Sequence, residues 1–142
     1  MKKTLEIFST LLRKEGLKAT SGRITILNIL TKFQKPVSIP FLRKSLRGQI
    51  NEVTIYRTLE TLTEGGLVQR VDLGHAHAHY EIIEKNRHHH HLICKTCGRL
   101  EDITGCISKN LEKTILENSK KFKNIISHSV ELFGICKQCI HA

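Results

Sequence analysis

Apolar residues recur at every third or fourth position through the first 64 residues, which is the spacing of one face of an α-helix. The pattern predicts four helices, at residues 4–15, 20–33, 39–46 and 51–64. Gly16 ends the first run, and residues able to cap a helix start precede the other three: Thr20 or Ser21, Ser38 and Asn51. Helical spacing in the first helix is shown by Leu5, Phe8, Leu11 and Leu12, and the buried side expected in the second comprises Ile24, Ile26, Leu27 and Leu30.

The fourth predicted helix separates apolar from polar positions most clearly. Ile55, Leu59 and Leu62 fall at i, i+4 and i+7 and predict a buried stripe. A polar stripe with a single charge, a positive one, runs beside it: Thr54, Arg57, Thr58 and Thr61. A helix face that only contacts water usually carries more Glu and Lys, so this stripe favours contact with DNA over simple solvation.

Two short apolar segments follow the helices and predict a hairpin. “LVQRVDLG” (67–74) and “HAHYEII” (77–83) read as strands joined through “LGHA”, whereas the earlier “QKPVS” (34–38) predicts a turn. Helices followed by a two-stranded wing predict a winged helix-turn-helix, which lays its recognition helix in the major groove. In that arrangement Arg57 suits a guanine edge or a phosphate, and the threonines suit phosphates or thymine methyls.

The pattern changes after residue 87, and the predicted boundary lies at residues 84–88. Two short strands (91–94 and 99–103) flank a “KTCG” knuckle, and a helix (106–122) and a final strand (124–136) follow. We therefore expect an α+β chain of two domains, residues 1–84 and 85–142.

The amino-acid composition indicates the kind of binding partner and the cellular location of the protein. Lys and Arg outnumber Asp and Glu by 23 to 13, and a net charge of +10 favours a polyanion such as nucleic acid. Lys2 and Lys3 are followed by Glu6 and Arg13 instead of an apolar run, so we expect neither a signal peptide nor a membrane span, and a cytoplasmic protein. Thiols stay reduced there, so the five cysteines are expected to be metal ligands or free thiols.

Four of the cysteines form two C-x-x-C pairs with 38 residues between them. Each pair makes a tight knuckle that directs two thiolates at one point, and two knuckles complete a tetrahedral Zn(II) site. The predicted structural zinc ligands are Cys94, Cys97, Cys136 and Cys139. Because a closed site of four sulfurs has no open position, its expected role is to hold the final strand against the first knuckle. Cys106 is left over; we expect a small buried apolar side chain there, with redox sensing as the less favoured alternative.

Seven of the nine histidines lie between residues 75 and 91. Side chains alternate along a strand, so His89 and His91 are expected on one face, with His88 and His90 on the other. The two pairs suit two separate sites, each completed by other donors: Glu81, Asp102, Glu112, His128 and the cluster His75, His77 and His79. Mixed nitrogen and oxygen ligands bind Fe(II), Zn(II), Mn(II) or Ni(II) exchangeably.

The order of these motifs resembles the ferric uptake regulator family. “LKATSGRITILNIL”, “VTIYRTLETLTEGGLV”, “HHHHLICKTCG” and “HSVELFGICKQC” together cover nearly the whole chain. The resemblance implies a dimeric, metal-dependent transcriptional regulator with a winged helix-turn-helix followed by a small α/β dimerisation domain. Such a regulator binds a pseudo-palindromic operator in double-stranded DNA, and we expect a repressor of metal uptake or homeostasis genes that senses iron or zinc.

The resemblance also assigns residues. It implies that Tyr56 and Arg57 contact DNA and that Lys18 reaches the minor groove. With Arg23 and the polar stripe, the expected DNA-contacting set is Lys18, Arg23, Thr54, Tyr56 and Arg57. The implied structural zinc ligands are the four paired cysteines. The implied regulatory site, which would hold one divalent metal, comprises Glu81, His89, His91 and Asp102, and the implied second site comprises His88, His90, Glu112 and His128.

Two departures from the family pattern leave alternatives open. Pro36 stands where many members have a sensing-site histidine, so the site either has one ligand fewer or takes His75, His77 or His79 instead. Asp102 stands where iron and zinc sensors often have Glu and peroxide sensors have Asp, so peroxide sensing by Fe-catalysed histidine oxidation is the second hypothesis. A small metallohydrolase and a zinc-stabilised protein adaptor are alternatives of other classes. The sequence lacks an H-E-x-x-H-like helix for the first of these, and its basic charge disfavours the second.

Overall fold

The computed structural model describes the chain except residues 1, 75–76, 84–88, 105–107, 127–129 and 141–142. The chain forms two compact units, Met1–Ile83 and Glu84–Ala142. Among the described residues, no helix is long and apolar enough to cross a membrane.

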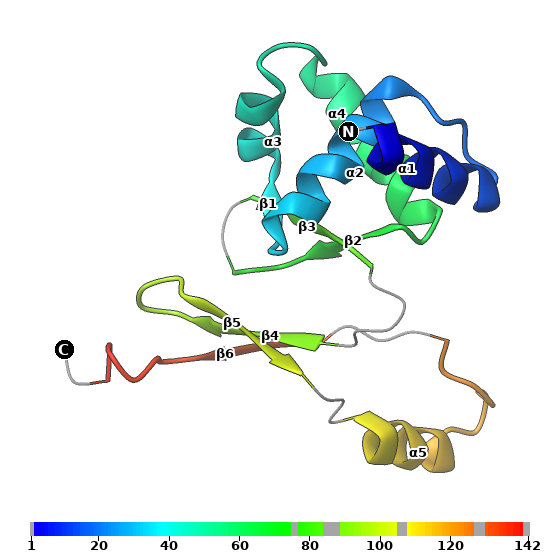
Figure 1. Ribbon diagram of the computed structural model, residues 1–142. Coiled ribbons are helices and arrows are strands. Elements are labelled where there is room, and N and C mark those ends of the chain that lie inside the picture. Colours follow the sequence, from blue (N-terminus) through cyan, green and yellow to red (C-terminus); the bar gives the residue numbers. More distant parts are fainter. Residues whose placement is uncertain (1, 75–76, 84–88, 105–107, 127–129, 141–142) are drawn as a thin grey trace. The chain divides into compact units, whose positions relative to one another are not determined.

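The four predicted helices of the first unit are confirmed to within two residues at each end (Figure 1). They are α1 (Lys2–Lys14), α2 (Ser21–Phe33), α3 (Ile39–Leu46) and α4 (Glu52–Glu64). The last three begin at capping side chains, because Thr20, Ser38 and Asn51 accept hydrogen bonds from backbone N–H groups of the first turn. The Asn51 cap is the shortest, with Oδ1 lying 2.8 Å from the backbone nitrogen of Thr54.

One continuous apolar core joins these helices. Its fully buried side chains in the helices are Leu12, Ile26, Leu27, Leu42, Leu46, Ile55, Leu59 and Leu62. The stripe predicted on α4 is therefore confirmed, as is the buried face of α2. Leu5 lies one turn before Phe8, near the start of α1, and 47 % of it stays exposed, so the apolar face of α1 joins the core from Phe8 onward.

Thr58 departs from the prediction. It was expected in the exposed polar stripe of α4, but only 7 % of it is exposed. Thr58 follows Ile55 by three positions and precedes Leu62 by four, so it lies inside the buried sector, which on a core-facing helix spans about 100° or more. The solvent face of α4 therefore contains Thr54 and Arg57 but not Thr58.

A small antiparallel sheet completes the first unit. Its strands are β1 (Val37–Ser38), β2 (Val68–Val71) and β3 (His79–Ile82), in the order β1-β3-β2. The hairpin of β2 and β3 was predicted, but β1 was read as part of a turn because two residues are too short for an alternating pattern. Tyr80 and Ile82 pack against the helical core, so His79 and Glu81 lie on the opposite face of β3.

The second unit contains β4 (His89–Cys94), β5 (Leu100–Thr104), α5 (Ser108–Asn118) and β6 (Glu131–Gly134). Its sheet has the order β5-β4-β6, with β4 antiparallel to β5 and parallel to β6. The final strand and the helix are shorter than predicted, and residues 106–107 of the expected helix lie outside the described residues. Among this unit's described residues, Ile93 and Cys94 are the buried apolar side chains, so its core is thin.

Candidate metal centre and nucleic-acid interface

The four paired cysteines converge in the second unit. Cys94 ends β4 and Cys97 lies in the following turn, while Cys136 and Cys139 follow β6. The parallel register pairs Cys94 with Gly134, which brings the second C-x-x-C beside the first. All four Sγ atoms lie within 4.8 Å of one another, and all four are free thiols.

The spacing of the sulfurs fits zinc. The Sγ atoms of Cys97 and Cys136 are 3.7 Å apart. Four sulfurs placed tetrahedrally about 2.3 Å from a zinc ion are separated by about 3.8 Å. The donor set and the spacing therefore match a closed structural Zn(II) site, in agreement with the prediction for Cys94, Cys97, Cys136 and Cys139.

Local hydrogen bonds prepare the thiols for a cation. The backbone N–H of Cys136 donates to Sγ of Cys94 over 3.3 Å, and this bond, helped by the backbone of Cys97, lowers the pKa of Cys94 to about 6. The backbone N–H of Cys139 lowers the pKa of Cys136. Hydrogen bonds with the neighbouring sulfurs, that with Cys136 first, raise the pKa of Cys139 to about 12, and charge repulsion from Cys136 adds to the rise. A divalent cation removes that repulsion.

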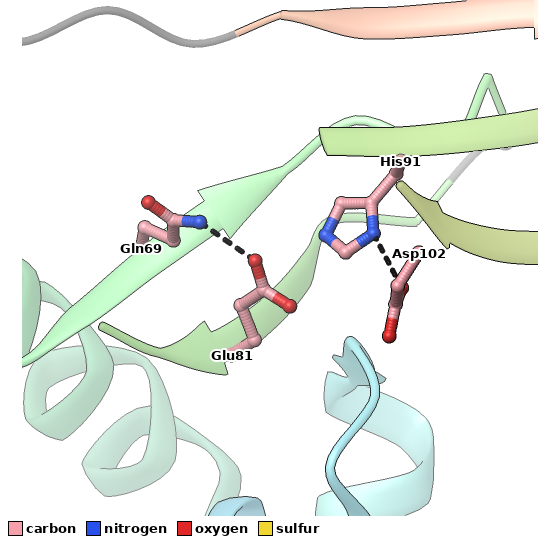
Figure 2. A network of polar contacts seen from close by, with 4 residues as sticks. All are labelled: Gln69, Glu81, His91 and Asp102. Carbon is pink, nitrogen blue, oxygen red and sulfur yellow. Dashed lines mark hydrogen bonds and ion pairs between the residues drawn. The ribbon is translucent and has the colours of Figure 1, made fainter. Parts of the chain in front are cut away.

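Strand β4 also carries a histidine cluster. His89 and His91 lie on one face with ring centroids 5.0 Å apart, and His91 is buried. Asp102, the cross-strand neighbour of His91 on β5, places Oδ1 3.1 Å from Nδ1 of His91 (Figure 2). This contact places a carboxylate oxygen beside the two imidazoles, so the sheet presents two nitrogen donors and one oxygen donor close together.

In the first unit, Glu81 is buried on β3 and is held by a residue that the sequence analysis did not single out. Gln69, its cross-strand neighbour on β2, donates from Nε2 to Oε1 of Glu81 over 2.6 Å (Figure 2). The sequence predicted the hairpin that contains both residues, but it did not give the pairing register of the two strands. Only that register places Gln69 opposite Glu81. This hydrogen bond orients the carboxylate of Glu81. The lone pairs on its two oxygens are enough both to accept this bond and to bind a metal ion.

The structure describes only some of the ligands predicted for the second metal site and some of the possible substitute ligands. His90 is buried on the face of β4 opposite His89 and His91, and Glu112 is half-buried on α5. His88 and His128, the other members of the second site, lie outside the described residues. Of the possible substitute ligands, His75 is also outside them and His77 is exposed before β3, whereas His79 is the first residue of β3.

The residues predicted to contact DNA lie on α4, in the loop before α2 and in the first turn of α2. Thr54, Tyr56 and Arg57 are exposed on α4, with Tyr56 50 % exposed. Lys18 is exposed, and its backbone carbonyl accepts a hydrogen bond from Nη1 of Arg23 over 2.8 Å. Arg23 therefore also stabilises the loop that presents Lys18.

Comparisons with known proteins agree on one family. The model of the “Ferric uptake regulator family” matches residues 14–133. The chain is 32 % identical over 142 residues to a ferric uptake regulation protein of Campylobacter upsaliensis, covering 96 % of this chain and 89 % of that one. It is 34 % identical to the protein of the same name from Legionella pneumophila, covering 90 % and 95 %.

A solved structure shows the same fold. The ferric uptake regulator of Pseudomonas aeruginosa, determined with manganese, superposes with a TM-score of 0.74 at 26 % identity, covering 91 % of this chain and 97 % of that one.

A winged helix-turn-helix followed by a small α/β domain with four clustered cysteines defines a metal-responsive DNA-binding regulator. The chain belongs to the ferric uptake regulator family, whose members regulate transcription. The fold class and the regulatory function expected from the sequence are thereby confirmed.

The zinc site yields a prediction about Cys136. Cys136→Ser is expected to abolish zinc binding and to raise amide hydrogen exchange across residues 89–95, because the thiolates hold β6 against β4. Zinc analysis and mass-spectrometric exchange measure both effects. Because zinc binding displaces the thiol protons, the apparent zinc affinity of the wild type should fall as the pH is lowered, and more steeply below about 6, where Cys94 of the metal-free protein also takes up its proton. Cys106→Ser is the matched control, and full zinc content in Cys136→Ser would contradict the assignment.

Proposed function

We propose that the chain acts in the cytoplasm as a homodimeric repressor that binds a pseudo-palindromic operator when a divalent metal occupies Glu81, His89, His91 and Asp102. The observation that carries the proposal is the pairing of His91 with Asp102 beside His89 on β4. Two imidazoles and a carboxylate on one sheet form a nitrogen and oxygen donor set that suits Fe(II), Zn(II), Mn(II) or Ni(II). Glu81, oriented by Gln69, supplies a further oxygen ligand from the first unit.

Metal binding would then couple to DNA binding through the junction of the two units. Glu81 precedes the junction at residues 83–84, and His89 follows it by five residues. An ion bound by residues from both units favours the relative orientation in which its ligands converge. A ligand shifts such an equilibrium only by its differential affinity for the two states. The metal would thus set the spacing of the two recognition helices in the dimer.

A second metal site, formed by His88, His90, Glu112 and His128, is part of the proposal. It is supported by the burial of His90 on the face of β4 that His89 and His91 do not occupy. Peroxide sensing is the second candidate function, and the contact of Asp102 with His91 favours it.

Sheet register supports His79, among His75, His77 and His79, as the ligand that replaces the histidine absent at position 36. Strands β1 and β3 pair Val37 with Tyr80 and Ser38 with His79, so position 36 continues the register opposite Glu81. His79 lies two residues from Glu81 on the same face of β3, and it lines a cavity of about 190 Å³ together with Pro36. We propose that His79 directs its imidazole towards the metal that Glu81 binds.

The regulatory site is tested by His89→Ala with His91→Ala. The double variant should keep its structural zinc and its weak binding to random DNA, but its operator affinity should no longer respond to added metal. A fluorescence anisotropy titration with and without Mn(II) measures this. A metal response equal to that of the wild type would refute the proposal. A loss of DNA binding after peroxide in the Fe(II) form but not in the Mn(II) form would favour the second candidate function.

The recognition helix is tested by Arg57→Ala. Removing a guanidinium that contacts a base edge should weaken operator binding by about 1–3 kcal/mol. The matched control is Arg13→Ala on α1, which removes an equal charge from a helix outside the proposed contact face. Equal losses in the two variants would mean that Arg57 contributes only charge.

The substitute ligand is tested by restoring a histidine at position 36. His79→Ala should weaken binding of the regulatory metal by about 10- to 100-fold, the range typical of losing a group that supports a metal site. Pro36→His in the same background should recover most of that loss, because continuing the β1–β3 register by one residue would place position 36 opposite Glu81. His77→Ala is the control. Unchanged metal affinity in His79→Ala would leave the site with one ligand fewer.

A further inference from the structure

The solvent face of α4 contains an apolar side chain that neither the core nor the metal sites use. Val53 is 60 % exposed in the first turn of the helix. It precedes Tyr56 by three residues and Arg57 by four, so the three side chains neighbour one another on the helix surface. The buried stripe of Ile55 and Leu59 faces the other way.

The first turn of α4 is held rigidly. The side chain of Asn51 caps it through the 2.8 Å bond to the backbone nitrogen of Thr54. Nη1 of Arg43, on α3, lies 3.1 Å from Oε2 of Glu52 and ties the same turn to the preceding helix. A β-branched side chain in a helix has one strongly preferred rotamer. Val53 therefore presents its two methyl groups in a fixed direction.

The charges along the same face restrict where α4 can approach DNA. Glu60 and Glu64 occupy its carboxyl-terminal half, where their carboxylates would repel phosphates, whereas Arg57 occupies the amino-terminal half. In a helix-turn-helix, the amino-terminal residues of the recognition helix contact the base edges. Val53 lies in that half, next to the arginine.

We propose that Val53 reads the 5-methyl group of a thymine in each operator half-site. The thymine methyl is the one apolar group that a base pair presents in the major groove, and apolar side chains recognise it by direct contact. A valine also has lower helix propensity than the residues that usually cover exposed helix surface, so local stability does not explain its presence. The inference rests on the proposed function, because it requires α4 to act as the recognition helix.

Deoxyuridine substitution tests the contact, since it removes only the methyl group. Zinc-containing protein loaded with Mn(II) is titrated into duplexes of the chain's own promoter in which each thymine is replaced in turn. At one symmetry-related pair of positions, the wild type should lose about fourfold in affinity per half-site, the value of one buried methyl group. Val53→Ala should lose a similar amount on the normal duplex and bind normal and substituted duplexes equally at those positions.

Glu64→Gln, on the same face but distant from the first turn, is the matched control and should keep the wild-type sensitivity. Circular dichroism should show Val53→Ala as fully folded, because the side chain is exposed. Undiminished sensitivity in Val53→Ala, or a wild type indifferent to every substitution, would overturn the inference while leaving the proposed function intact. A wild type that binds promoter and scrambled DNA equally would overturn the proposed function itself.

Discussion

Four thiolates compensate for the thin core of the second unit. Its described buried apolar side chains, Ile93 and Cys94, bury too little surface to hold a three-stranded sheet by the hydrophobic effect alone. Strands β4 and β6 are far apart in sequence and pair in parallel, and the two cysteine knuckles follow directly on these strands. A zinc ion bound by Cys94, Cys97, Cys136 and Cys139 therefore fixes the strand that carries the histidines. The orientation of His89 and His91 depends on this clamp.

The first unit is stable for a different reason, and this difference matters for function. Its helices share a continuous core, and capping side chains fix the starts of α2, α3 and α4. Such a unit can present Arg57 and Tyr56 on a rigid helix without help from a metal. In the proposed function, the regulatory metal contacts this unit through Glu81. It binds Glu81, which Gln69 already orients, and so converts metal concentration into a preferred placement of the recognition helix.

Local patterns predicted most of the fold, whereas pairing across the chain needed the structure. The four helices, the hairpin and the zinc cysteines followed from apolar spacing, capping residues and the C-x-x-C pairs. Strand β1 was missed because its two residues carry no period. Thr58 was misplaced because a polar residue can lie within a buried helix sector. Gln69 was missed because its role depends on the register that places it opposite Glu81. The proposal of His79 among three candidate histidines likewise rests on register.

In the proposed function, metal binding and DNA binding are coupled, and thermodynamic linkage makes this coupling directly measurable. If metal raises the affinity for operator by some factor, operator must raise the affinity for metal by the same factor. The decisive measurement is the Mn(II) affinity of the zinc-containing protein, determined by calorimetry with and without a saturating operator duplex. Coupling predicts tighter Mn(II) binding in the presence of operator and no change with scrambled DNA. Identical Mn(II) affinities in all three conditions would contradict it.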